Sequence, residues 1–207
     1  MSLIAKEKGS SKLPPMPEGS YTAVCYGVID LGVQTVKFEN SEKEQDQVLI
    51  LWAFPGETVE IDGEEKPRTI SKTYTKSLHE RSGLRKDLKS WRGREFTEEE
   101  LKGFSLTKIL GAACMLQIIH KETKAGTFAN IASIMSLPKG LPAPACDMPP
   151  VVFDADESTE AELAALPEWI QNKITESRTW KERFAPKPAS GASGFVDAED
   201  DGELPWN

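Results

Sequence analysis

The sequence predicts a mainly β protein, in which a five-stranded barrel has a helical insert after its third strand. Three observations support this prediction. Apolar residues alternate or form short unbroken runs along five segments, which is typical of strands. An amphipathic helical pattern follows the third segment. After the fifth segment comes a further helical pattern, and then an acidic, Gly- and Pro-containing stretch that we predict to be a disordered tail.

The first strands are predicted from their apolar patterns. In Ser20–Val36, apolar residues occur at both odd and even positions, which point to opposite faces of a strand. We therefore expect a long central strand with both faces covered. Residues Gln47–Phe54 contain an unbroken apolar run and are expected to stop at the Pro-Gly pair that follows. Segments Thr58–Ile61 and Thr69–Thr75 lie on either side of an Asp-Gly pair, which indicates a hairpin.

The insert contains two predicted helices. Ser82 is expected to cap a helix over Gly83–Trp91, because its large apolar residues recur on one helical face. Thr97 and Glu100 have the spacing of a capping box, so a short helix is expected to begin there and to end at Gly103.

A final hairpin completes the predicted barrel. Residues Leu116–Lys121 and Thr127–Met135 are strand-like and are separated by Lys124-Ala-Gly126. Five strands with a helix after the third is the element order of an OB-fold barrel. A different small β-barrel or a sandwich would give much the same pattern, so the sequence leaves these alternatives open.

The chain divides into five regions by composition. The N-terminal stretch is polar and Pro-rich, and a second Pro-rich stretch follows the barrel. The helical pattern after it is expected to break at Pro167, and its apolar stripe predicts packing on the barrel or on a partner. The predicted regions are a flexible arm at 1–18, the barrel domain at 19–140, a linker at 141–157, a helical segment at 158–184 and a disordered acidic tail at 185–207.

The net charge of −8 is unevenly distributed along the 207 residues. Residues Met1–Gly140 have 20 Lys and Arg against 19 Asp and Glu, whereas Leu141–Asn207 has 5 against 14. The body is therefore near neutral, and the acidity belongs to the C-terminal part. Such an asymmetry is expected if the tail and a nucleic acid compete for one basic surface.

Composition argues against several classes of protein. No apolar stretch approaches the ~18 residues of a membrane span, and no secretory signal is recognised, so we expect a cytoplasmic protein that does not bind membranes. Three distant cysteines and two histidines have no metal-ligand spacing, so no metal or cofactor is expected. Cys25 and Cys114 lie in apolar stretches and are predicted to be core residues.

The segment Ser71–Arg94 is the candidate nucleic-acid site. It has eight cations against two acids, a net charge of +6. Most charge runs are solvated surface, but so strong an excess in a nearly neutral body favours the binding of an anion such as nucleic acid. Single-stranded nucleic acid needs cations along a groove with aromatic faces beside them, and Tyr74, with Phe128 as a second choice, is the predicted stacking residue. The predicted phosphate contacts are Lys72, Lys76, Arg85, Lys86, Lys89, Arg92 and Arg94, joined by Lys121, Lys124 and Lys139 near the last hairpin.

The acidic C-terminus is the second candidate site. A large aromatic residue on a disordered tail has a function only if a partner binds it, although a purely solubilising tail is an equal alternative. The predicted partner-binding residues are Asp200, Asp201, Glu203, Leu204, Pro205 and Trp206.

Catalytic arrangements are sparse. Asp62, Glu64 and Lys66 have the order of a nuclease motif, but they fall in a predicted turn that would not fix a metal ion. No phosphate-binding loop of the G-x-x-x-x-G-K-[ST] type occurs. We therefore predict a protein that is not an enzyme and has no catalytic residues.

Together, these segments resemble phage-encoded single-stranded DNA-binding proteins of the OB-fold type with an acidic C-terminal tip. The resemblance implies a protein that coats single-stranded DNA during phage or prophage replication and recombination in the host bacterial cytoplasm. It also implies a tail that recruits replication or recombination proteins, and a possible homo-oligomer. Trp206 followed by Asn207 departs from the terminal Phe that is usual in that family. The resembling segments are Tyr21–Gly32, Leu84–Arg94 with Phe96, Leu110–Gln117, Phe128–Ile131, Leu137–Gly140 and the acidic tip.

Three rival functions remain open at this point. A strand-annealing recombination protein would use a similar basic surface but would form rings or filaments. An adaptor or virion protein would dock a partner through its acidic tail, and its body would never touch DNA. A metal-dependent nuclease is disfavoured, because the sequence has no convincing set of carboxylates.

Overall fold

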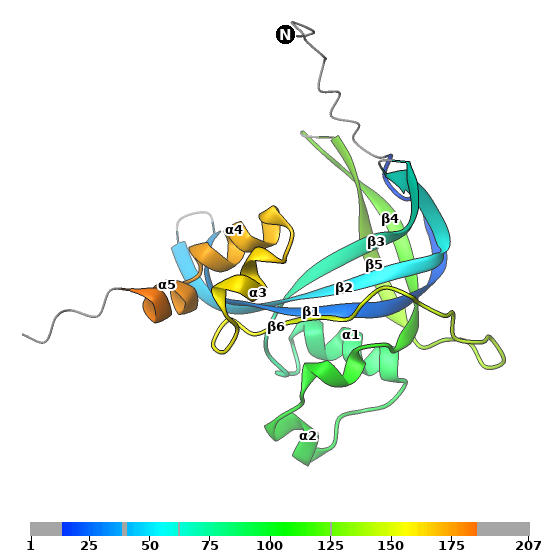
Figure 1. Ribbon diagram of the computed structural model, residues 1–207. Helices are drawn as coiled ribbons and strands as arrows, with labels where there is room; N and C mark the ends of the chain where they lie inside the picture. Colours follow the sequence, from blue (N-terminus) through cyan, green and yellow to red (C-terminus); the bar gives the residue numbers. More distant parts are fainter. Residues whose placement is uncertain (1–13, 39–40, 62, 125, 186–207) are drawn as a thin grey trace, which may run out of the picture.

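The computed structural model describes residues 14–38, 41–61, 63–124 and 126–185. The predicted acidic tail lies outside these residues, apart from Ala185. The described chain is mainly β, as predicted: five antiparallel strands form a curled half-barrel in the order β3-β2-β1-β4-β5 (Figure 1). The strands are β1 (Gly19–Phe38), β2 (Ser41–Ile61), β3 (Glu64–Thr75), β4 (Ala113–Thr123) and β5 (Gly126–Met135).

Strand β1 is central to the sheet, as its apolar pattern predicts. One of its edges pairs with β2. The other edge pairs with two strands. The first part of β1 pairs with β4, and Gly27–Ile29 pairs in parallel with the short strand β6 (Val151–Phe153). Strand β6 lies inside the predicted linker at 141–157, so the linker prediction is wrong for these three residues.

Strand β2 is longer than the sequence predicts. The prediction of a stop at Pro55-Gly56 is wrong, because β2 continues to Ile61 and keeps pairing with β3. The ladder shifts register between Phe54 and Thr58, which marks a bulge. A bulge removes residues from the regular ladder, so the missing N–H of a proline is tolerated there.

Three helical elements lie between β3 and β4: α1 (Gly83–Arg92), α2 (Glu98–Lys102) and the 3₁₀ turn η1 (Leu106–Ile109). The predicted caps are confirmed. The Ser82 hydroxyl accepts a hydrogen bond from the Arg85 N–H (3.1 Å), and Thr97 and Glu100 form the capping box. The amide of Ser136 donates to the carbonyl of Ser90 (3.3 Å), which ties α1 to the end of β5.

The core inside the half-barrel is large and aromatic. Trp52 and Trp91 lie with ring centroids 5.9 Å apart, and the Trp91 indole N–H donates to the carbonyl of Ala113 (2.9 Å). Cys25 and Cys114 are fully buried, which confirms both as core residues, and this burial raises the pKa of the Cys25 thiol to about 12 and also raises that of Cys114. Other buried members are Val48, Ile50, Phe54, Leu84, Leu88, Leu116, Ile118 and Ile134.

The C-terminal helices cover the opposite face of β1 and β2. They are α3 (Glu160–Ala164), α4 (Glu168–Glu176) and α5 (Arg178–Phe184). The predicted break at Pro167 is confirmed, and a second break occurs at Ser177. None of the described helices is long and apolar enough to cross a membrane. The second core contains Ile29, Leu31, Leu49 and Leu51 from the sheet, and Phe153, Leu163, Leu166, Ile170, Ile174 and Trp180 from the C-terminal part.

The junction of α4 and α5 lies directly on β1. Gly32 has a φ of +68°, and a Cβ there would come within 2.9 Å of both Ser177 Oγ and Thr179 Cβ, so glycine is required at this contact. The Val33 amide donates to the Thr179 hydroxyl (3.1 Å), and the Gln34 side chain donates to the Lys173 carbonyl (2.9 Å). The sequence leaves open whether the helical segment packs on the barrel or on a partner, and the structure places it on the barrel.

Part of the predicted N-terminal arm packs against the sheet. Met16 is buried in the core inside the half-barrel, so the prediction of a loose arm is wrong for the described residues 14–18. Hydrogen bonds from β3 and β4 hold this segment: His120 Nε2 donates to the Met16 carbonyl (2.9 Å), the His120 amide donates to Glu18 Oε1 (2.7 Å), and Arg68 donates to the Pro14 carbonyl (2.9 Å). The segment therefore connects β3 and β4 near the open side of the sheet.

Candidate nucleic-acid interface

The sequence predicts that Tyr74 stacks on bases, and this prediction is wrong. Tyr74 pairs in register with Val48, whose side chain belongs to the core inside the half-barrel, so the Tyr74 ring is only 5% exposed. Its hydroxyl donates to Asp87 Oδ2 (2.8 Å). Burial raises the pKa of Tyr74, and the negative charge of Asp87 raises it further. The Tyr74 ring packs between β3 and α1, so its face is not available to a base.

Lys72 and Lys76 already have carboxylate partners. Lys72 Nζ lies 2.7 Å from Asp87 Oδ2, and Lys76 Nζ lies 2.7 Å from Asp30 Oδ2 and 3.0 Å from Asp46 Oδ2. Partial burial by itself would lower the pKa of Lys76, but the two carboxylates together raise it above its ordinary value. A phosphate would have to displace these partners, so neither lysine is a free cation of a binding groove.

The exposed side of α1 keeps part of its charge available. Lys86 is exposed and forms no ion pair with any residue that the structure describes. Lys89 pairs with Glu95, and both side chains remain more than half exposed. Arg85 donates to the backbone carbonyl of Leu78 (3.2 Å). Lys86 is therefore the predicted contact on α1 that is most available to a ligand.

Arg92 and Arg94 are joined by one carboxylate. Both guanidinium groups bind Glu100, with Arg94 Nη2 at 2.8 Å from Oε1. The guanidinium carbon of Arg92 lies 4.5 Å from the ring centroid of Phe96 and 4.9 Å from that of Phe104, and its side chain is 13% exposed. Arg92 is thus a largely buried structural cation, whereas the Arg94 side chain is 56% exposed. The sequence indicates Glu100 as a helix-capping residue but not as the partner of two arginines.

The binding of two arginines to Glu100, which we call the Glu100 clamp, predicts how stability depends on pH. Hydrogen bonds from Arg94 and from the Thr97 backbone lower the pKa of Glu100 from 4.5 to about 2. A carboxyl group with a lowered pKa in the folded state stabilises the fold above its unfolded pKa, and the effect is lost as the pH falls toward the folded pKa. We expect Glu100→Gln to lower the melting temperature at neutral pH, and the difference from wild type to shrink between pH 4.5 and about 2.

Thermal melts of both proteins across this pH range measure the difference. Glu99→Gln is the matched control, because Glu99 is exposed on the same turn and forms no ion pair with the described residues. A difference between wild type and Glu100→Gln that stays constant down to pH about 2 would contradict the clamp.

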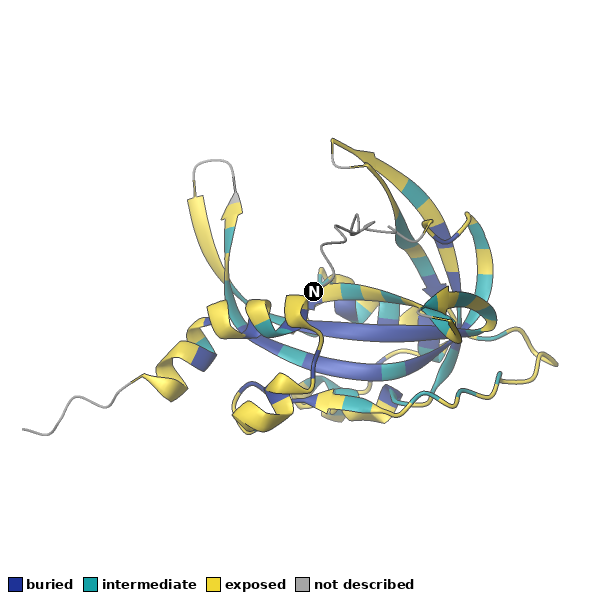
Figure 2. Cartoon of the chain, turned by 45° about the horizontal axis from the view of Figure 1, so that its top comes forward, coloured by how far each residue is buried: buried dark blue, intermediate teal, exposed yellow. Residues whose placement is uncertain are grey.

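The β4–β5 hairpin brings a predicted aromatic residue and predicted cations together. Lys121 and Phe128 are opposite each other in the ladder, so their side chains lie on the same face. Phe128 is 49% exposed, and Ile119, two residues before Lys121 on that face, is 42% exposed. Lys124 is exposed at the turn. Figure 2 shows this hairpin projecting from the sheet with exposed residues along it. We call Ile119, Lys121, Lys124 and Phe128 the hairpin patch.

The predicted cations do not lie in one groove. Helix α1 is tied to the end of β5 at Ser136, and Phe128 lies eight residues earlier, about 26 Å away along an extended strand. In Figure 1 the tip of the hairpin is at the top of the sheet, and α1 and α2 are below it. Lys139 is exposed beyond β5. The prediction of a single basic surface is therefore wrong: the cations form a hairpin group and an α1 group.

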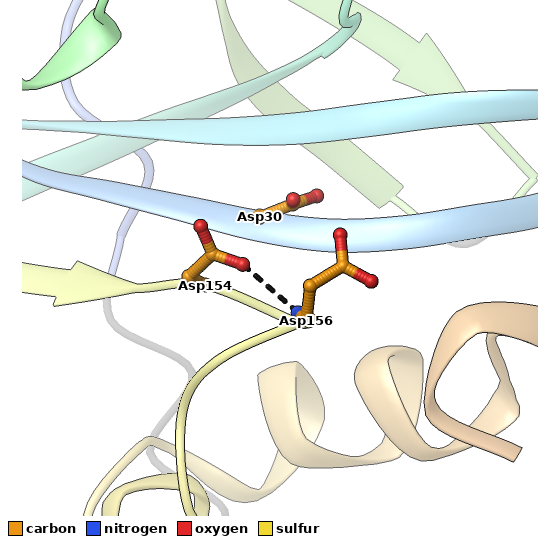
Figure 3. A group of neighbouring side chains, drawn as sticks. All are labelled: Asp30, Asp154 and Asp156. Carbon is orange, nitrogen blue, oxygen red and sulfur yellow. Dashed lines mark hydrogen bonds between the residues drawn. The ribbon is translucent and has the colours of Figure 1, made fainter. Parts of the chain in front are cut away.

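Three carboxylates gather at a place that the sequence analysis does not identify. Oxygen atoms of Asp30, Asp154 and Asp156 all lie within 4.8 Å of one another (Figure 3). The amide of Asp156 donates to Asp154 Oδ1 (2.9 Å), and Asp30 accepts from Lys76. Oxygen ligands suit Mg²⁺ or Ca²⁺, but Lys76 already supplies positive charge to this group, and we assign it no metal. Only the Asp-x-Asp spacing at 154 and 156 is visible in the sequence.

No protein-family model matches this chain, and no curated protein matches it either. Among the described residues, the hairpin patch is a place where an exposed aromatic ring and exposed lysines occur together.

Proposed function

We propose that this protein binds single-stranded DNA without sequence preference, and that the hairpin patch makes the principal contact. The supporting observation is the pair Lys121 and Phe128, a cation and an aromatic ring that are exposed side by side on one face of a projecting hairpin. Single-strand binders combine these two elements, since cations neutralise phosphates and rings stack on bases of any identity. Phe128 takes the role that the sequence predicts for Tyr74.

We further propose that the half-barrel is an OB-fold. The strand order β3-β2-β1-β4-β5, with α1 between β3 and β4, is the order of an OB barrel opened between its third and fifth strands. In such barrels the loop between the fourth and fifth strands is a ligand-binding loop. The hairpin patch occupies the corresponding place here, which supports the assignment of both fold and function.

In the proposed mechanism the two groups of cations have separate roles. Phe128 stacks on a base while Lys121 and Lys124 neutralise phosphates at the hairpin. Lys86, with Arg85, Lys89 and Arg94, offers a second contact for a strand that continues around the barrel. Lys72, Tyr74 and Lys76 stabilise the fold instead of binding DNA.

The biological setting belongs to the same proposal. We propose a non-enzymatic role in phage or prophage replication and recombination in the host cytoplasm. The acidic end at Asp200–Trp206, which lies outside the described residues, would recruit partner proteins.

An adaptor that does not bind DNA is the second candidate, because most cations of the Ser71–Arg94 segment already pair with protein carboxylates. A strand-annealing protein would share the hairpin surface, and a mass measurement with an annealing assay distinguishes it.

Fluorescence titration with single-stranded and duplex oligonucleotides tests the proposal. We expect preferential binding of the single strand. Log K is expected to fall by at least about 1.4 per tenfold increase in salt, because each phosphate contact contributes about 0.7 and the hairpin offers two lysines. Titrations at about 50 and about 200 mM salt measure this slope. A flat salt response would exclude the phosphate mechanism, and no binding of any oligonucleotide would favour the adaptor.

A further inference from the structure

A pocket of about 410 Å³ lies at the α1 end of the half-barrel, away from the hairpin patch. It is formed where the end of α1, α2, η1, the start of β4 and the residues after β5 meet. This volume is within the range of small-ligand sites, which is roughly 300–1,000 Å³. The lining residues that matter for the argument are Arg92, Arg94, Phe104, Lys108, Ile109 and Leu137.

The charge of the pocket favours an anion. Arg92, Arg94 and Lys108 line it against one carboxylate, Glu100, so its net charge is +2. The Arg92 guanidinium lies beside the rings of Phe96 and Phe104 and binds Glu100, and its Nη1 is buried without a hydrogen-bond partner among the described residues. A buried donor without an acceptor is rare in folded proteins. The cations of the pocket that a ligand can reach are Arg94 and Lys108, since both side chains are exposed.

The walls of the pocket favour a ligand that also has a flat, apolar part. Phe104 is partly exposed, and Ile109 and Leu137 line the same space. A bare phosphate would leave these walls without contact, whereas a nucleobase would pack against them. A ring beside cations is the combination that single-stranded nucleic acid uses, since its bases and phosphates alternate.

A second hollow with three cations lies beside the pocket. It shares Arg94 with the pocket and is lined by Lys86, Lys89 and Glu95. Helix α1 has ten residues and is therefore about 15 Å long. A polyanion that leaves the pocket would meet further cations along this helix, which a small anionic metabolite would not need.

We propose that this pocket binds one nucleotide unit of the DNA strand, with its base against Phe104 and its phosphate between Arg94 and Lys108. The inference rests on the proposed function and extends it, because it gives the strand a second anchoring point that is separate from the hairpin patch. It also gives a role to Phe104 and Lys108, which the sequence analysis does not select.

Two variants test the pocket. Lys108→Ala removes an exposed cation and is expected to lower the salt slope of oligothymidylate binding by about 0.7. Phe104→Leu keeps an apolar side chain but loses the stacking face, and is expected to weaken binding at least about fivefold. Lys102→Ala is the matched control, because Lys102 is exposed on α2 and does not line the pocket. Melting temperatures verify that each variant is folded.

Calorimetry with thymidine monophosphate and thymidine on the full chain tests the pocket without a strand. We expect saturable binding of the monophosphate that is lost in Lys108→Ala, and weaker binding of thymidine. Equal binding of the two would overturn the phosphate assignment. A pocket that binds an acidic peptide and no monophosphate would overturn the proposal in favour of a protein ligand.

The outcomes separate the pocket from the proposed function. If Lys108→Ala and Phe104→Leu bind oligonucleotide like Lys102→Ala while a change at Phe128 weakens binding, the pocket proposal fails and the function stands. If wild-type protein binds no oligonucleotide, the proposed function fails, and binding of the monophosphate alone then decides whether the pocket is a nucleotide site.

Discussion

Replacing Ile174 with alanine is expected to lower the free energy of unfolding by about 2–5 kcal/mol, the usual cost of removing a large aliphatic side chain from a packed core. Ile174 is fully buried in the core that α4 shares with Ile29, Leu31 and Leu49 of the sheet. The loss comes from the removed apolar contacts and from the cavity that remains. Urea denaturation, monitored by tryptophan fluorescence, measures this change in the free energy of unfolding.

Asn172→Ala is the control for that experiment. Asn172 is exposed on the same helix, so its replacement is expected to change stability by no more than about 0.5 kcal/mol. We expect one cooperative transition for both variants, because the helices and the sheet share a core. An unchanged midpoint for Ile174→Ala, or a separate early transition of the helices, would contradict the shared core.

Replacing Phe128 with alanine is expected to weaken single-strand binding about 5- to 150-fold, because base–aromatic stacking contributes about 1–3 kcal/mol per base. The stability of the fold is expected to change little, since about half of the Phe128 side chain is exposed. Fluorescence anisotropy with a labelled oligothymidylate at low salt measures the affinity, and thermal melts measure the stability.

Three further variants define the cause of that loss. Phe128→Trp keeps an aromatic face and is expected to retain affinity, whereas Phe128→Leu is expected to lose it. Phe184→Ala removes another exposed phenylalanine, on α5, and is expected to bind DNA as wild type does. Wild-type affinity in Phe128→Ala would show that the hairpin does not stack bases, and the hairpin-centred proposal would then be wrong.

The sequence predicts the strands and helix caps well because these features depend on local residues. The Ser82 cap and the Thr97–Glu100 capping box involve positions only three residues apart, so the spacing alone identifies them. The buried strands are visible because apolar runs such as that of Gln47–Phe54 have few other structural uses. The Pro55-Gly56 stop fails because a bulge in the paired ladder is not a local property.

The candidate site is predicted less well because it depends on strand register and on distant partners. Lys72 and Tyr74 lie two residues apart, and their alternation says only that they share a face. The pairing of Tyr74 with Val48 makes that face the inner one. Asp87 on α1 then binds both side chains, which no spacing in the sequence specifies.

Counting charges along the chain overestimates the charge that a ligand meets. The carboxylates of Asp30 and Asp46 come from other strands and neutralise Lys76. Glu100 lies beyond the counted segment and joins two of its arginines. The hairpin lysines fall outside the densest segment, yet they remain exposed, and they stand beside an exposed aromatic ring.

The shared second edge of β1 determines where the chain can be shortened. The sequence suggests that a domain ends near Gly140, but a protein cut there would lack β6 and the three C-terminal helices. One face of the sheet would then expose a large apolar surface, formed by Ile29, Leu31, Leu49 and Leu51. Exposed apolar surfaces of this kind favour aggregation. A shortened version that keeps this apolar surface covered should therefore extend through Phe184.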